Sequence, residues 1–445
     1  MLKHQPWIHY APDMMTEWMQ CMEEGLDVES YRPICEKIAA SPAGWDTLAW
    51  EIAEKMHAAP VREGYPYDEP SGYEEILAKR PAKRHTFQKP DPDALRDKLK
   101  GAWTGRIAGC LLGKPVEGMR RPQLYALLGG TDNYPMHKYI CKKDFTDEVR
   151  TKANVDDNRC WADNLGGIEP VDDDTNYTVF GLKLLESRGW DFTPADVMEC
   201  WLSFIPFLNL CTAERAAYRN GAMGLLPPET ASYQNPFREW IGAQIRGDFF
   251  GYICAGDPEK GAALAWRDAS ISHVKNGIYG EMYCTAMTAA AAVCDDIMTV
   301  IEAGLDEIPA ACRLRHDVEL VIGWYREGLN REQIIEKIHE TYNENTAHGW
   351  CHTNSNAMIV TMALLLGGGD FEKSVCGAVQ AAFDTDCNGA TVGSIVGMLR
   401  GYDALPKIWS EPFKDGLYTS IQGYNLVTVD TLVEKTAAVM KHCPA

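Results

Sequence analysis

The sequence predicts an all-α fold, and three observations lead to that prediction. Apolar residues recur three and four positions apart along most of the 445-residue chain, which is the period of a helix with one buried face. Glycines such as Gly189, Gly367 and Gly401 stand where these segments would end. Segments that alternate between apolar and polar residues are rare, and residues 427–429 are the best candidate for a strand.

The predicted elements divide the chain into two parts. Residues 1–94 are predicted to form an N-terminal helical extension and a proline-rich linker, because helical spacing gives way to six prolines between residues 59 and 93. A basic run at 79–84 is interpreted as a solvated part of this linker. A helix capped by Asp93 should begin near Ala94 and open an all-α main domain, residues 95–445. Further helices are predicted over residues 174–186, 281–297, 317–327, 331–342, 354–366, 371–383 and 388–399.

Composition excludes several classes of function. The chain has 43 basic and 63 acidic residues, a net charge of −20, whereas a nucleic-acid-binding protein needs a basic surface. No apolar run approaches the ~20 residues of a membrane-spanning helix, and residues 1–20 lack the apolar core of a secretory signal. The fifteen cysteines form no CxxC pair, so we expect reduced thiols in a cytoplasmic protein rather than zinc ligands.

Two sets of glycines predict that two distant helices touch. The sets are Gly101, Gly105, Gly109 and Gly113, and Gly389, Gly393, Gly397 and Gly401. Each set leaves one face of a helix without side chains, although glycine inside a helix costs about 1 kcal/mol relative to alanine. Close approach of two backbones explains this pattern; coincidence in a glycine-rich chain is the alternative. If the helices pair, residue 113 lies near the start of the helix at 388.

Two acidic clusters stand directly before predicted helices. The first is Asp172, Asp173 and Asp174, and the second is Asp384 and Asp386. A single aspartate in this position is explained as a helix cap, but neighbouring carboxylates repel one another unless they are protonated or neutralised. A shared cation removes the conflict, and oxygen ligands favour Mg²⁺, Mn²⁺ or Ca²⁺ over zinc. Spacing alone leaves metal binding and helix capping equally open.

Glu117 is a further candidate for the same site. It follows the first glycine stripe in a turn that Pro115 and Gly118 favour. If the stripes pair, its carboxylate lies near Asp384 and Asp386. An ordinary glutamate in a surface turn is the simpler alternative.

Together these motifs resemble those of the ADP-ribosylglycohydrolase family. Residues 105–117 resemble its opening helix and glutamate loop, residues 172–175 its Thr/Ser-Asp-Asp-Thr motif, and residues 384–389 its Asp-x-Asp-Thr motif. Residues 218–223 and 272–273 are similar to two weaker segments near its ligand site. The resemblance covers about residues 95–405 and implies an all-α fold with a binuclear Mg²⁺ centre.

The resemblance also implies an activity and the residues that perform it. It implies a hydrolase that cleaves a ribosyl N- or O-glycosidic bond, classically that of ADP-ribose on a modified acceptor, with a metal-bound water as nucleophile. The expected metal ligands are Asp172, Asp173, Asp174, Asp384, Asp386 and Glu117. Asp384 or Glu117 would act as the catalytic base. Substrate contacts are expected from Asn220, Gly221, His273, Asn276 and Tyr279.

Two positions depart from the family pattern, and they leave alternatives open. Asp172 stands where Thr or Ser is usual, and Cys387 stands where Thr is usual; a neutral thiol is a poor ligand for Mg²⁺. The substrate is either an ADP-ribosylated protein or a small glycoside such as a nucleoside, because a net charge of −20 opposes a pyrophosphate. A module that binds ADP-ribose without hydrolysis is a third interpretation.

Overall fold

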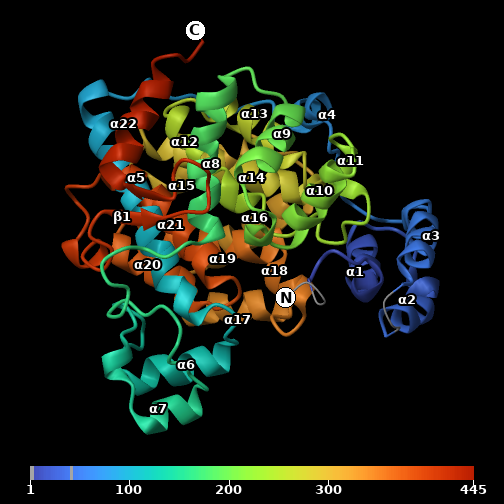
Figure 1. Cartoon of the computed structure of the whole chain (residues 1–445), viewed down its shortest axis with the longest axis horizontal. Helices are drawn as coiled ribbons and strands as arrows, with labels where there is room; N and C mark the ends of the chain where they lie inside the picture. Colours follow the sequence, from blue (N-terminus) through green and yellow to red (C-terminus); the bar gives the residue numbers. More distant parts are fainter. Residues whose placement is uncertain (1–4, 41–43, 445) are drawn as a thin grey trace.

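The computed structural model describes residues 5–40 and 44–444, and it confirms the all-α prediction (Figure 1). The sheet formed by these residues is one antiparallel pair, β1 (Gly416–Tyr418) and β2 (Leu426–Thr428), at the predicted strand. The N-terminal helices are α1 (Met14–Glu23), α2 (Arg32–Ala39), α3 (Asp46–His57) and α4 (Tyr73–Lys79). The helices that follow are α5 (Pro92–Gly113), α6 (Arg121–Gly130), α7 (Asp147–Lys152), α8 (Asp173–Arg188), α9 (Pro194–Phe204), α10 (Thr212–Ala222), α11 (Glu229–Ser232), α12 (Asp248–Ile253), α13 (Pro258–Ala269), α14 (Lys275–Ala291), α15 (Ile297–Leu305), α16 (Arg313–Arg326), α17 (Arg331–Thr341), α18 (Ala347–Cys351), α19 (Thr353–Gly367), α20 (Phe371–Gln380), α21 (Thr385–Arg400) and α22 (Val429–Met440).

The predicted helices form, but several of them have different ends. α16 begins at Arg313 rather than at 317, α20 ends at Gln380 rather than at 383, and α21 begins at Thr385 rather than at 388. The helix expected to begin near Ala94 starts at Pro92, and its cap is Asp91, whose carboxylate accepts from the backbone N–H of Asp93 at 3.1 Å. The prediction of Asp93 as the cap is wrong because proline favours the first position of a helix, where its missing N–H costs nothing. The helix expected over 281–297 is α14, which begins at Lys275 and ends at Ala291.

The glycine stripes pair as predicted. The facing residues are Gly101 and Gly397, Gly105 and Gly393, and Gly109 and Gly389. A Cβ atom built on Gly109 would lie 1.9 Å from the carbonyl oxygen of Gly389, so no residue but glycine fits without movement of a helix. Gly113 lies against the backbone of Thr385 in the same way. The C-terminal end of α5 therefore meets the N-terminal end of α21.

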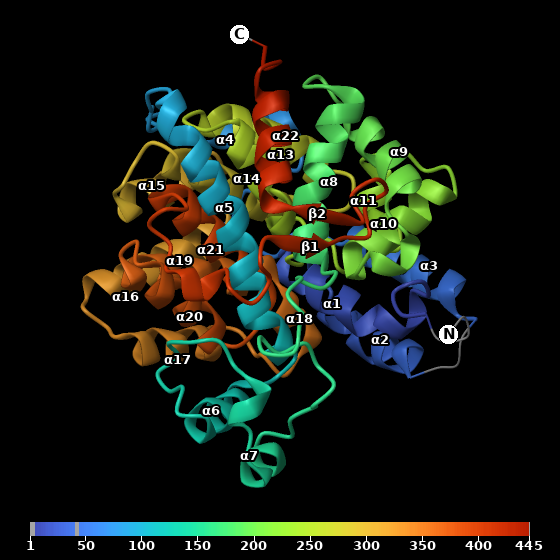
Figure 2. The same cartoon turned by 60° about the vertical axis from the view of Figure 1, so that its left-hand side comes forward.

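This helix pair lies at the centre of the molecule. Figure 2 shows α5 and α21 side by side, with α20 packed on α21 and α22 packed on α5. α14 is buried along nearly its whole length and contacts α13, α15, α19 and α21. α6 and α7 form a lobe that projects from the rest (Figures 1 and 2).

The N-terminal extension, residues 1–94, has a small core of its own in its described part. The buried residues of this core are Tyr10, Ala11, Met14, Cys21, Val28, Cys35, Ile38, Ala49, Ala53 and Met56. Figure 1 shows α1, α2 and α3 together at one edge of the molecule. The linker is less solvated than predicted: the Arg80 side chain is 5% exposed and pairs with Glu307 and Glu259 of the main domain. The solvated interpretation of the basic run is wrong for Arg80, because these two carboxylates compensate its burial.

Among the described residues, no helix combines the length and the apolar character needed to span a bilayer. All fifteen cysteines are free thiols, nine of them buried. The buried ones pack as small apolar side chains, and the sequence predicts that most of the cysteines do so.

Candidate active site

The two acidic clusters meet at one cavity of about 530 Å³. The carboxylates in its wall are Asp13, Glu117, Asp172, Asp173, Glu214, Asp384 and Asp386. Ligand atoms of Glu117, Asp384 and Asp386 lie within 4.8 Å of one another, and so do those of Asp174, Asp386 and Cys387. The structure thus brings together the residues expected to hold metal ions, although more than 200 residues separate the two clusters along the chain.

The ends of two helices place these carboxylates. Asp172 caps α8, since its carboxylate accepts from the backbone N–H of Asp174 at 2.9 Å. The second cluster follows Ala382 and Phe383, whose φ angles are 64° and 57°. Non-glycine residues rarely adopt this conformation, and surrounding packing holds such strain at functional sites. The bend turns the chain directly ahead of Asp384, the residue that precedes α21.

The cluster is electrostatically unfavourable on its own. Burial, then the charges of Asp386 and Glu117, raises the pKa of Asp384 well above its usual range. Burial, followed by the charges of Asp172 and Asp386, raises the pKa of Asp173 to about 8. The side chain of Glu117 is open to the cavity, and the charge of Asp386 is the main cause that raises its pKa. Each carboxylate therefore opposes the ionisation of its neighbours.

Two basic residues that the sequence analysis does not single out offset part of this charge. Lys114 pairs with Asp172 and, against the effect of burial, keeps the pKa of that carboxyl low. The extra charge that Asp172 brings to the family motif is thereby matched. Arg106 is completely buried on α5 and pairs with Asp174 at 3.1 Å and with Asp248 at 2.8 Å.

Unpaired oxygens in the middle of the cluster indicate where a cation fits. Asp174 Oδ2 and Asp386 Oδ1 are buried and accept no hydrogen bond, and a buried polar atom without a partner costs about 1–3 kcal/mol. The donors around them are mainly carboxylate oxygens, which suit a hard divalent cation such as Mg²⁺. Cys387 adds one soft donor to this set.

The five residues expected to contact the substrate do not line the cavity. Asn220 is buried on α10, where its amide donates to the carbonyl oxygen of Tyr233 at 2.7 Å, and Gly221 follows it on the same helix. His273 is buried in the core with its Nδ1 atom 2.8 Å from Ser272 Oγ.

The last two of these residues hold the N-terminal extension. Asn276 Nδ2 donates to Glu69 Oε1 at 2.8 Å, and the hydroxyl of Tyr279 donates to the carbonyl oxygen of Pro70. These two polar groups of α14 are therefore occupied by the chain's own N-terminal region. Sequence reasoning could not foresee this arrangement, because residues 1–94 match no motif.

An aromatic wall completes the cavity. It consists of Trp7, Phe237, Trp240 and Trp350. The rings of Phe237 and Trp240 lie 4.8 Å apart at an angle of 62°, and Trp7 packs against the cluster that these two residues form with Ala213. They come from three distant parts of the chain, so only the fold reveals the wall.

Glu214 is a cavity carboxylate that the sequence analysis also missed. Its Oε1 atom accepts from Arg246 Nη1 at 2.8 Å. Burial raises its pKa to about 7, although Arg246 acts in the opposite direction. A carboxyl group that titrates near neutral pH is suited to accepting and returning protons.

The helical fold and the carboxylate-lined cavity define a class of helical proteins with an acidic cavity. The sequence profile of the ADP-ribosylglycohydrolase family matches residues 91–441, so the chain belongs to that family of glycoside hydrolases, as the resemblance predicted. A solved structure described as an ADP-ribosylglycohydrolase-related protein complex is similar with 18% identity and a TM-score of 0.46, over 78% of this chain and 98% of that one. No curated protein matches the chain.

Proposed function

We propose that the protein is a Mg²⁺-dependent hydrolase that cleaves a ribosyl N- or O-glycosidic bond, most simply the bond between ADP-ribose and a modified acceptor. One observation carries the proposal: the two acidic clusters converge on one cavity and leave Asp174 Oδ2 and Asp386 Oδ1 buried and unpaired. Helix capping alone would account for one carboxylate at each helix. Membership of the family supports glycohydrolase chemistry in general.

Six carboxylates would hold the two ions, with Mn²⁺ or Ca²⁺ as alternatives to Mg²⁺. They are Asp172, Asp173, Asp174, Asp384, Asp386 and Glu117. When bound, the ions would supply neutralising charge, orient the ribose hydroxyls and make a water more acidic. Lys114 and Arg106 would keep Asp172 and Asp174 in place by their ion pairs, so that the carboxylates need little rearrangement when an ion arrives.

A proton must leave the attacking water, and this chain offers two carboxylates for that step. Asp384 and Glu117 lie within 4.8 Å of each other at the cavity wall. We assign the base to one of this pair. Glu117 is the more exposed of the two, which lets it pass the proton on to solvent.

A small glycoside or nucleoside is the second candidate substrate. The cavity of about 530 Å³ is in the range of small-molecule sites, and its many carboxylates oppose a pyrophosphate. A non-catalytic module that binds ADP-ribose remains the alternative from another class. The free thiols are consistent with the cytoplasmic location that we propose.

The substrate test is direct. The purified chain is incubated with Mg²⁺ and ADP-ribosyl-arginine, ADP-ribosyl-serine or a panel of nucleosides, and released sugar is measured. Sugar from the ADP-ribosyl compounds supports the first candidate, and sugar from nucleosides alone supports the second. Thermal stabilisation by ADP-ribose without any product would indicate a binding module.

Variants of both clusters test the site itself. Asp384→Ala and Asp174→Ala should each abolish turnover and lower the affinity for Mg²⁺ measured by calorimetry, and EDTA should abolish turnover of the wild type reversibly. Asp191→Ala, which changes an exposed aspartate outside the cavity, is the matched control. Full activity of either cluster variant would contradict the proposal.

A further inference from the structure

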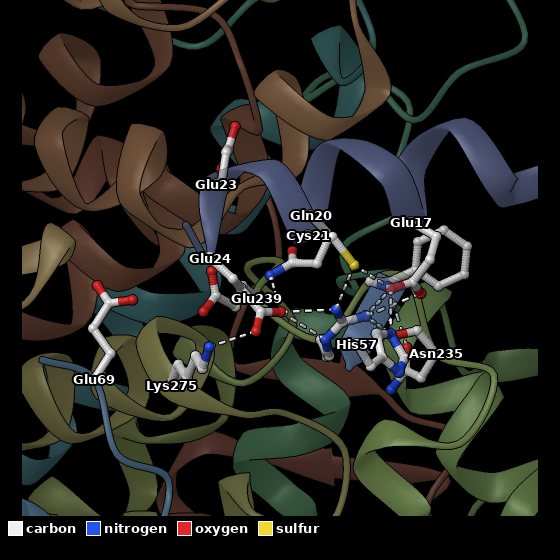
Figure 3. Close-up of polar contacts among 12 residues, drawn as sticks. Glu17, Gln20, Cys21, Glu23, Glu24, His57, Glu69, Asn235, Glu239 and Lys275 are labelled. Atoms are coloured by element: carbon white, nitrogen blue, oxygen red, sulfur yellow. Dashed lines mark hydrogen bonds and ion pairs between the residues drawn. The ribbon is translucent and has the colours of Figure 1, made fainter. Parts of the chain in front are cut away.

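Buried ion pairs fix the N-terminal extension to the main domain. Glu17 of α1 and Glu24, the residue after α1, pair with Arg238 at 2.8 and 2.7 Å, and Lys275 Nζ lies 2.5 Å from Glu24 Oε2. Figure 3 shows Glu17, and Glu24 at the end of α1, on the side of the helix that faces Lys275. The side chain of Glu17 is 0% exposed and that of Arg238 is 5% exposed. The extension is therefore docked through ion pairs that are shielded from water on both sides of the contact.

A second contact of α1 fixes a residue of the cavity wall. Glu23 points away from the first group (Figure 3), and its Oε2 atom lies 3.1 Å from His348 Nε2 and 3.2 Å from His352 Nε2. His348 Nδ1 accepts from Trp240 Nε1, and His352 Nδ1 accepts from the backbone N–H of Asn354. Both Nε2 atoms therefore carry the ring proton, which leaves them no lone pair for a metal ion. The cluster serves docking, and it fixes Trp240 of the cavity wall through His348.

Two arginines of α10 hold Trp7 at the cavity. Arg219 Nη1 donates to the carbonyl oxygen of Ile8 at 2.6 Å, and the Arg215 guanidinium lies over the Trp7 ring, 4.8 Å from its centre. The φ angle of Trp7 is 63°, in the left-handed region that bulky residues avoid. Strain of this kind persists only where the surroundings impose it, and it is common at ligand sites.

The extension also brings polar groups to the cavity. Asp13 and Thr16, at the start of α1, line it together with Trp7. The Asp13 carboxylate caps no backbone N–H of α1, although it stands at the usual position for a cap. Its oxygens therefore remain available to a ligand in the cavity.

We propose that the extension is a wall of the substrate cavity whose Trp7 and Asp13 select substrates with a flat aromatic group, bearing N–H donors, beyond the ribose. Trp7 offers a stacking surface and Asp13 offers acceptors for the N–H groups. The inference rests on the proposed function and specifies its substrate class. It concerns a part of the chain that lies before the region matched by the family, which begins at residue 91.

The test compares two ligands that share a ribose. Adenosine carries a flat base with an amino group, whereas methyl β-D-ribofuranoside has no base. Calorimetry on the full-length chain in EDTA, which stops turnover, should show adenosine binding at least about tenfold more tightly, as expected for one stacked base. Trp7→Ala should remove most of this difference, Trp7→Phe should retain most of it, and Asp13→Asn should reduce it about threefold. Trp45→Ala, at an exposed tryptophan of the same extension, should leave both affinities unchanged.

The outcomes separate this inference from the proposed function. Equal affinities for the two ligands, or no binding of either, would overturn the inference. It would also be overturned if Trp7→Ala kept the difference while its melting temperature stayed that of the wild type. If Trp7→Ala does not fold, Trp7→Phe and Asp13→Asn decide the question. A wild-type chain that prefers adenosine but releases no sugar with Mg²⁺ would contradict the proposed function alone.

Discussion

The central helix pair and the N-terminal extension are attached to the molecule by opposite means. α5 and α21 touch through backbone atoms, and their contact consists of positions without side chains, such as Gly109 and Gly389. α1 docks through long charged side chains, such as Glu17 and Arg238, that are buried on both sides. A side-chain atom added between α5 and α21 would force the helices apart, whereas a charge removed from the contact of α1 would leave its partner buried and unpaired. The comparison shows that the scaffold of the site depends on shape, whereas one of its walls depends on charge pairing.

Filling the glycine contact should have the largest effect. In Gly105→Ala/Gly109→Ala the new Cβ atoms would lie 2.1 and 1.9 Å from carbonyl oxygens of α21, so the helices must separate. We expect a loss of more than about 5 kcal/mol in the free energy of unfolding, or no folded protein. Urea unfolding followed by circular dichroism measures the loss. Gly323→Ala is the control, since nothing lies within 4 Å of its Cβ position on α16; an equally small effect in both proteins would refute the shape argument.

Breaking the charged contact should come next. Arg238→Gln leaves Glu17 and Glu24 buried without their main partner, which should cost about 3–5 kcal/mol. Hydrogen exchange should show that α1 loses protection before α5 and α21 do.

Two further variants show whether the cost arises from buried charge. Arg32→Gln removes an exposed pair with Glu36 within the same extension and should cost less than about 0.5 kcal/mol. Removing both charges with Arg238→Gln/Glu17→Gln should cost less than Arg238→Gln alone. Uniform loss of protection across the whole chain would speak against a separately docked extension.

The same contrast explains how much of the fold the sequence could predict. Glycines four residues apart are a local pattern, and the pairing of α5 with α21 follows from it. The docking of α1 depends on single residues such as Glu17 and Arg238, each of which has an ordinary local surrounding. The prediction placed the cap of α5 two residues too late because Asp91 and Asp93 are both residues that can cap a helix, and Pro92 favours the first helical position. Local order was readable, but long-range pairing of isolated charges was not.

The candidate site divides in the same way. Its acidic clusters were predictable because several carboxylates in a row exceed what helix capping needs. Its countercharges were not, since Lys114 and Arg106 meet Asp172 and Asp174 only where the segment 92–116 packs against the start of α8. The aromatic wall could not be predicted either, because Trp7 belongs to a region outside the family match.

A smaller effect, the pH dependence of stability, should distinguish the N-terminal extension from the helix pair α5 and α21. Burial, and then the charge of Asp46, raises the pKa of Asp13 to about 6. The folded state therefore binds this proton more tightly than the unfolded state, so the stabilisation is complete below about pH 4 and is lost as the pH rises through 6. The loss amounts to at most about 3 kcal/mol.

Urea unfolding between about pH 4 and 7 tests this sign. The free energy of unfolding of Asp13→Asn should fall less than that of the wild type over that range. Above pH 6 the variant should be the more stable of the two. Asp27→Asn, at an exposed aspartate of the same extension, should keep the slope of the wild type. Parallel curves for Asp13→Asn and the wild type would show that Asp13 does not titrate in this window.

The smallest effect, a change in metal affinity, should come from the sulfur atom of Cys387 on α21, the part of the site that the helix pair supplies. Cys387 Sγ lies within 4.8 Å of ligand atoms of Asp174 and Asp386, and a thiol favours Zn²⁺ or Cd²⁺ over Mg²⁺. Cys387→Thr, which restores the hydroxyl usual in the family, should raise the Mg²⁺ affinity up to about tenfold, or about 1.4 kcal/mol, and lower the Cd²⁺ affinity. Equilibrium dialysis measures both, with Cys376→Thr on α20, outside the cavity wall, as the control. Because Cys387 touches only the scaffold end, protection of α1 from hydrogen exchange should stay unchanged. A change in α1 would instead mean that the shape-dependent and charge-dependent attachments are coupled through the cavity that they share.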